Sequence, residues 1–100
     1  MAVFAVTYTY AENSDAARDE HRPAHREYLG GLSEQGANLV SGPFGPQDAP
    51  GALLLFRGGS AGEVRALLEK DPFVLEGLVA DVQVREWSAV LGPLAEHLRP

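Results

Sequence analysis

The sequence predicts a single α+β domain with the element order βαββαβ. Residues 2–10 and 52–56 are apolar segments of strand length, and residues 79–87 alternate between apolar and polar side chains. Two segments between these strands, 14–35 and 60–71, carry apolar residues at helical spacing. The chain has 100 residues without a repeat or an internal linker, and a domain of this size buries about 65% of its unfolded surface.

The first and third strands are expected at the centre of the sheet. Neither alternating set of side chains in residues 2–10 carries a charge, and "ALLLF" (52–56) is a continuous apolar run. The second strand, 37–43, is short and ends at Pro43, and the loop 44–51 that follows is rich in Gly and Pro. In residues 79–87, polar side chains separate the valines, which is typical of a half-exposed edge strand.

Capping residues and prolines set the expected limits of both helices. Ser14 or Asp15 begins the first helix, which ends near Gln35 because Gly36 provides a C-terminal stop. Pro23 predicts either a kink in this helix or a late start at Arg22. Ser60 and Glu63 form a capping box for the second helix, and Pro72 predicts that it stops at Asp71. Residues 88–100 are expected to form one short turn.

This order of elements is the split βαβ arrangement of ferredoxin-like folds, with a four-stranded antiparallel sheet. Two helices can cover only one face of such a sheet. A second copy of the same sheet is the simplest cover for the other face, so burial predicts a homodimer through the sheet face.

Composition excludes several classes of protein. The chain has no cysteine, so disulfides and thiolate chemistry are absent. Its net charge is −6, with 14 acidic and 8 basic side chains, which is unfavourable for a nucleic-acid partner. No signal peptide and no membrane-spanning segment are evident, so we expect a cytoplasmic protein without a membrane partner.

Two histidines four residues apart, His21 and His25, suggest a metal site or a catalytic base. Such spacing can chelate zinc, but Pro23 lies between them and the remaining histidine, His97, is in the tail. We therefore expect no metal and no other cofactor. His25 shares a helical stripe with Leu29 and Leu32, so it is expected to face the sheet.

A histidine in such a place needs a hydrogen-bond partner, and Asp71 is the candidate. Simpler interpretations exist for both residues, since His25 would fit an ordinary core histidine and an Asp before Pro often forms an Asx turn. Arg26, Glu27 and Glu34 are expected on the opposite side of the helix from His25. Gly30 and Gly31 each cost the helix about 1 kcal/mol relative to Ala. Close helix–sheet approach or a helix break would explain them.

Five segments of the chain resemble, in order, those of the YCII-related (YciI-like) proteins: "RPAHREYLGGL", "GANLVSGPFG", "GALLLF", "ALLEKDPFVLEGL" and "VQVREW". The most specific parts are Arg-x-x-His, the Gly-Pro that closes the second strand, and Asp-Pro-Phe. This resemblance implies a dimeric α+β barrel and a His–Asp pair in a small pocket, which would be His25 and Asp71. His21 has no place in that pattern. Fold relatives include lactone isomerases and cofactor-free oxygenases, so the resemblance leaves the substrate open.

Three hypotheses follow for function. In the first, a small cofactor-independent enzyme, a lyase or isomerase, uses His25 and Asp71 for acid–base chemistry on an organic acid or lactone. Arg22 or Arg85 would hold a substrate carboxylate, Ser41 and Gly42 would hold an anionic oxygen, and the loop 44–51 would be a lid. In the second, the same pocket of a regulatory module binds a small molecule without turnover. In the third, the pair only ties two helices together in an assembly subunit.

Overall fold

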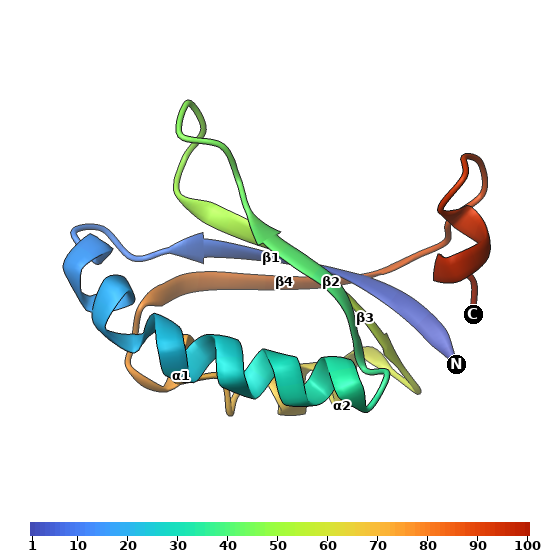
Figure 1. The fold of residues 1–100 in the computed structure, drawn as a ribbon, viewed down its shortest axis with the longest axis horizontal. Coiled ribbons are helices and arrows are strands. Elements are labelled where there is room, and N and C mark those ends of the chain that lie inside the picture. Colours follow the sequence, from blue (N-terminus) through green and yellow to red (C-terminus); the bar gives the residue numbers. More distant parts are fainter.

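The computed structural model describes all 100 residues and has a four-stranded antiparallel sheet in the order β2-β3-β1-β4. All helices of the first 78 residues lie on one face of this sheet (Figure 1). The elements are β1 (Ala2–Tyr10), α1 (Asp15–Glu34), β2 (Asn38–Pro43), β3 (Gly51–Gly58), α2 (Ala61–Leu68), α3 (Pro72–Leu75), β4 (Val79–Trp87) and a final 3₁₀ turn (Ala95–Leu98). The predicted α+β class, four-stranded antiparallel sheet and central pair of strands are confirmed.

The core lies between the sheet and α1 and α2. Even-numbered residues of β1 face the helices, and Val6 stands between Leu54 of β3 and Val84 of β4. Odd-numbered residues of β1 therefore point to the opposite face, which we call the outer face. The buried core comprises Phe4, Val6, Tyr8, Leu29, Leu32, Ala52, Leu54, Phe56, Val64 and Leu68.

Helix α1 is continuous through Pro23, so the alternative of a late start at Arg22 is wrong. The missing backbone N–H of Pro23 is tolerated in the helix, whose first turns are inclined to the rest in Figure 1. The predicted stop is confirmed at Gly36, whose φ of 81° is the left-handed conformation that ends many helices. Gly30 and Gly31 lie inside the helix, and a Cβ at either position would meet no atom within 4 Å. Neither close approach nor a break therefore explains these glycines.

The second helical region consists of two helices. Ser60 Oγ accepts a hydrogen bond from the backbone N–H of Glu63 at 3.1 Å, as the capping box predicts. The prediction that this helix stops at Asp71 is wrong, because α2 ends at Leu68. Asp71 has an extended backbone (φ −65°, ψ 126°), which Pro72 favours in the residue before it, and it is the N-cap of α3.

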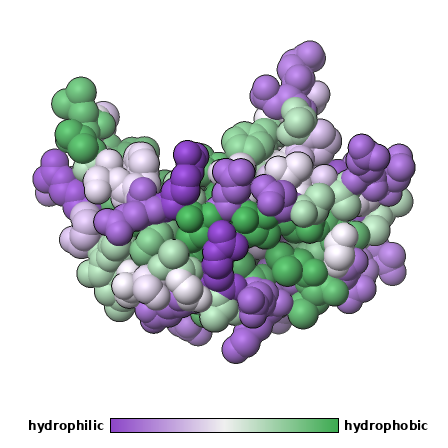
Figure 2. Space-filling view, turned by 180° about the vertical axis from the view of Figure 1, so that it is seen from behind, coloured by the Kyte–Doolittle hydropathy of each residue, from purple (hydrophilic) through white to green (hydrophobic).

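Two segments project from the outer face of the sheet (Figure 1): the loop 44–50 and the C-terminal residues 88–100. Arg57 anchors the C-terminal segment by donating to the backbone oxygen of Arg99 at 2.7 Å. Figure 2 shows a hollow between the two projections, and the C-terminal one is apolar where Val90 and Leu91 are exposed. The loop points away from α1 and does not cover the helix side of the sheet (Figure 1). None of the helices has the length and apolar character needed to cross a bilayer.

Candidate active site

The His25 side chain projects from α1 toward the sheet, and other residues hold both the edge and the face of its imidazole ring. Its Nδ1 is 2.7 Å from Oδ1 of Asp71. The imidazole ring stacks on Phe73, with 3.8 Å between ring centroids and 5° between ring planes. The side chain is 14% exposed, so only one part of the ring is open to solvent. These contacts leave Nε2 as the ring nitrogen available to a ligand.

Asp71 is fully buried and accepts three hydrogen bonds. The Tyr8 hydroxyl donates to Oδ2 at 2.8 Å, and the backbone N–H of Phe73 donates to Oδ1 at 3.0 Å. Because Oδ1 of an ionised carboxylate can only accept, the proton of a neutral His25 ring resides on Nδ1. Nε2 then carries a lone pair. The bond to the Phe73 N–H is also an Asx turn, so Asp71 serves the local turn and the histidine together.

Tyr8 remains a hydrogen-bond donor to Asp71 over the whole neutral range. Burial raises the pKa of Tyr8 far above its ordinary value, and the negative charge of Asp71 and the hydrogen bond to it raise this pKa further. Burial also raises the pKa of Tyr10, while the nearby Arg18 and Arg22 act in the opposite direction. The guanidinium of Arg18 lies over the Tyr10 ring, 4.2 Å from its centroid.

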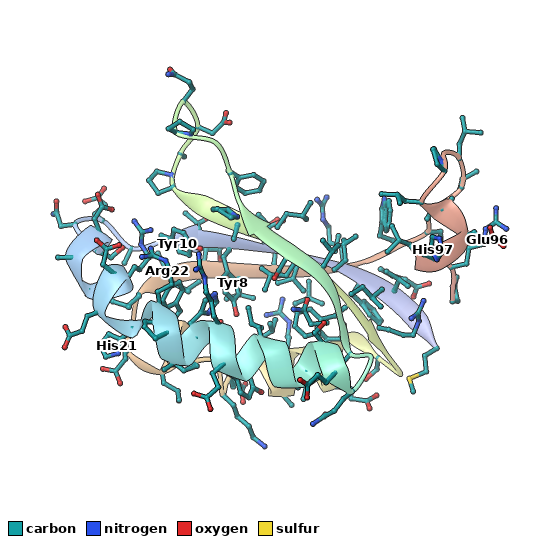
Figure 3. All side chains as sticks on the ribbon, in the orientation of Figure 1. Tyr8, Tyr10, His21, Arg22, Glu96 and His97 are labelled. Carbon is teal, nitrogen blue, oxygen red and sulfur yellow. The ribbon has the colours of Figure 1, made fainter.

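A cavity of about 330 Å³ opens between α1 and the strands β1, β2 and β3, next to His25. This volume suits a small organic molecule. Figure 3 shows Tyr8, Tyr10 and Arg22 in the space between α1 and the sheet. The cavity is lined by Tyr8, Tyr10, Arg18, Arg22, His25, Arg26, Leu29, Gly30, Ser33, Asn38, Ser41, Gly42, Pro43, Ala52, Leu54 and Phe73.

The lining is cationic although the chain has a net charge of −6. It contains three arginines from successive turns of α1 and no Asp or Glu. Arg18 pairs with Asp15, and Arg22 pairs with Asp19 at 2.5 Å, but Arg26 has no ion pair. Arg26 is therefore the guanidinium most available to a ligand anion.

The structure brings together most of the residues that the sequence singled out. The same cavity as that of His25 is lined by Arg22, Ser41 and Gly42, and Asp71 bonds the edge of the imidazole ring. Arg85 is the exception: it pairs with Ala5 on the outer face, so its assignment to substrate binding in this cavity is wrong. The two-residue period of β4 places it there.

The other two histidines lie away from the cavity. His21 points out from α1 and has Nε2 3.8 Å from Glu76, and His97 is at the far end of the molecule (Figure 3). His21 and His25 therefore do not converge on one point. No three side chains of the types His, Asp and Glu cluster as metal ligands would.

Sequence reasoning misses or misplaces three residues of this region. The sequence pattern marks Tyr8 only as a residue of the first strand and Phe73 only as part of the Asp-Pro-Phe motif. Arg26 is expected on the opposite side of α1 from His25, but it lines the cavity mouth. The helical stripe that includes Leu29 at i+3 and Gly30 at i+4 from Arg26 is the signal that could have found it.

A family model of the YCII-related domain matches residues 2–88, and the chain belongs to this family. Among solved structures, the chain is similar to 5-chloro-2-hydroxyhydroquinone dehydrochlorinase (TftG) from Burkholderia phenoliruptrix AC1100, in complex with 2,5-dihydroxybenzoquinone. The identity is 27% and the TM-score is 0.76, over 88% of this chain and 95% of that chain. No protein with a curated description is similar in sequence. The structural relative is thus an enzyme of small molecules.

Proposed function

We propose that the protein is a cofactor-independent enzyme that isomerises a small organic acid or lactone, or eliminates a group from it. The observation that carries this proposal is the hydrogen bond of 2.7 Å between Nδ1 of His25 and the buried carboxylate of Asp71, at the wall of the cavity. That contact fixes the tautomer that presents Nε2 as a base. The similarity to a dehydrochlorinase supports chemistry of this kind on a small molecule.

In the proposed reaction, Nε2 of His25 removes a proton from a carbon next to a carbonyl group. Asp71 stabilises the imidazolium that forms, and Phe73 holds the plane of the ring. The electron pair of the broken C–H bond moves to the carbonyl oxygen, where Ser41 and Gly42 supply a hydroxyl and a backbone amide. The imidazolium then returns the proton to a neighbouring atom, or a leaving group departs.

The substrate of this reaction is an anion. Arg22 and Arg26 stand at the cavity on either side of His25 along α1, and the lining offers no carboxylate to oppose a negative charge. A guanidinium forms paired hydrogen bonds with a carboxylate, so Arg26 would anchor that group beside the base.

Deuterium exchange tests the proposal while the substrate is still unidentified. The protein is incubated in D₂O with a panel of small keto acids, lactones and hydroxyquinones, and exchange of C–H for C–D is followed by proton NMR. His25→Gln is expected to slow the exchange roughly 10²–10⁴-fold, the usual contribution of a general base. His21→Gln, one turn earlier on α1, is the matched control and is expected to change nothing. Equal rates in the wild type and His25→Gln would contradict the acid–base role. Saturable binding of a panel member without exchange would instead favour a regulatory binding module.

We also propose that a second copy of the chain covers the outer face, forming a dimeric α+β barrel. On that face, Leu53 of the central strand β3 is 42% exposed, and Val40 of the neighbouring strand β2 is 54% exposed. Sedimentation of the wild type is expected to show a dimer, which Leu53→Asp converts to a monomer. Leu75→Asp, on α3 and equally apolar, is expected to leave the dimer intact. A monomeric wild type would overturn this assembly.

A further inference from the structure

The end of the cavity farthest from Arg18 contains an unpaired polar group. Asn38, the first residue of β2, lines the cavity and is 7% exposed. Its Nδ2 reaches Ser41 Oγ only at 3.5 Å, and its Oδ1 has no hydrogen-bond partner. Turning the amide over would give Oδ1 the contact to Ser41 and leave the NH₂ unpaired instead. In both orientations one end of this buried amide lacks a partner, which buried polar groups rarely do.

The opposite wall at this end is open. Gly30 of α1 lines the cavity, and a Cβ there would meet no atom within 4 Å. Its backbone has the ordinary negative φ of a helix, so no strain requires glycine. Glycine weakens a helix relative to alanine, and here the chain gains no packing in return. Gly30 lines the cavity and is exposed, so the space left by the missing side chain joins the cavity to solvent. Ser33, one turn further along α1, adds a hydroxyl to the same lining.

This polar end is offset from the His25 end along the helix, and Ser41 lies between the two, because the register places Asn38 beside Phe56, Ser41 beside Leu54 and Pro43 beside Ala52. Gly30 follows His25 by more than one turn of α1, which is about 7 Å along the helix axis. A molecule that contacts both ends must therefore be longer than a single carboxylate or carbonyl group. The two ends also differ in character, because Arg18 and Arg22 line the His25 end, whereas Asn38 and Ser33 add neutral hydrogen-bonding groups at the other end, beyond Arg26.

We propose that Gly30 and Asn38 form a second subsite, which binds an uncharged hydroxyl group at the far end of the substrate. This inference rests on the proposed function, and it defines the substrate as an anion with a distal hydroxyl. A hydroxyl both donates and accepts, so it satisfies the unpaired end of the Asn38 amide in either orientation. Oδ1 itself is closed to solvent, and a rotation about the soft amide torsion brings the unpaired atom to the ligand. The open wall at Gly30 admits the group that carries the hydroxyl.

Two probes that differ in one hydroxyl test the subsite: phenylacetate and para-hydroxyphenylacetate. Each is titrated into the full-length, ¹⁵N-labelled protein, and affinity is taken from the shifts of the backbone amides of α1 and β2. In the wild type, para-hydroxyphenylacetate is expected to bind roughly 3–10-fold more tightly, as one neutral hydrogen bond provides. Asn38→Ala is expected to abolish this preference while phenylacetate binds as before. Equal affinities in the wild type, or a preference that survives Asn38→Ala, would overturn the subsite.

Two neighbouring glycines provide a matched pair of variants. Gly30→Ala and Gly31→Ala should both raise the unfolding temperature slightly, because alanine is the better helix former and neither Cβ meets another atom. Gly31 does not line the cavity, so only Gly30→Ala is expected to weaken binding of para-hydroxyphenylacetate, by tenfold or more. A Gly30→Ala variant that unfolds more easily than Gly31→Ala would show a structural need for this glycine and would overturn the argument.

The tests separate the subsite from the proposed function. If deuterium exchange depends on His25 but the hydroxyl preference is absent, only the subsite is wrong. If the hydroxyl preference depends on Asn38 but no exchange occurs, the cavity binds such anions and the acid–base chemistry is wrong.

Discussion

The substitution Asp71→Asn tests whether the buried carboxylate organises the site. Asparagine keeps the size of the side chain and one acceptor oxygen, which would remain with His25 and the Phe73 N–H. Its NH₂ group would then face the Tyr8 hydroxyl, which at present donates to Oδ2 at 2.8 Å. The phenol can accept from this NH₂, but its own proton loses its acceptor in a buried place. The two remaining bonds become neutral instead of charge-assisted.

These changes set the expected loss of unfolding free energy. A hydrogen bond to a charged group contributes roughly 1.5–3 kcal/mol and a neutral one roughly 0.5–1.5 kcal/mol, while removal of the carboxylate charge also removes its desolvation cost. The net loss of unfolding free energy is therefore about 2 kcal/mol. In a domain of this length, that loss lowers the unfolding temperature by roughly 8–16 °C.

Thermal and urea unfolding followed by circular dichroism measure this loss, and ¹⁵N NMR of the imidazole reports the tautomer of His25. Asp81→Asn, an exposed aspartate on β4, is the control and is expected to stay within about 0.5 kcal/mol of the wild type. The Nδ1–H tautomer is expected to persist, because the Asn oxygen still accepts from it. If Asp71→Asn were as mild as this control, the buried carboxylate would not organise the site.

Two further predictions concern stability. Burial and the charge of Asp71 raise the pKa of Tyr8, so the folded state retains a proton that the unfolded chain loses near the ordinary tyrosine value. This contribution is fully present below about pH 10 and is lost above it, at about 1.4 kcal/mol per pH unit. Urea unfolding of Tyr8→Phe should therefore show lower stability at neutral pH but a shallower decline in alkali, and an unchanged slope would refute this. Ser60→Ala removes the cap of α2 and should cost about 1 kcal/mol in the same assay, whereas Ser88→Ala in the exposed tail should cost nothing measurable.

The fold was predictable because its signals are local and periodic. Charge-free alternation in β1, the apolar run in β3 and the alternation in β4 define which strands are central, and the structure places them so. The limits of α1 also followed from local signals, since Gly36 adopts the left-handed conformation that its position suggested.

The parts that failed depend on contacts between distant residues. The two-residue period of β4 puts Arg85 opposite the core valines, but only the folded structure shows that the cavity lies on the other face of the sheet. The hydrogen bond from Tyr8 to Asp71 joins residues 63 positions apart, and no local pattern indicates it. The end of α2 failed for a different, local reason: Pro72 prevents the helix from passing Asp71 but does not make it reach Asp71, and α2 ends at Leu68 while the same proline starts α3.

The tripeptide Asp71-Pro72-Phe73 supplies both contacts that hold the imidazole of His25, the carboxylate at its edge and the aromatic ring on its face. Because the proline ring fixes one of the few torsions between these side chains, their relative placement is largely a property of the turn itself. Such a segment is a local motif that can be transferred to another protein. Grafted opposite a helix that presents a histidine at the right distance, it would carry both contacts with the imidazole into another scaffold. An insertion of one residue within it would separate the two contacts.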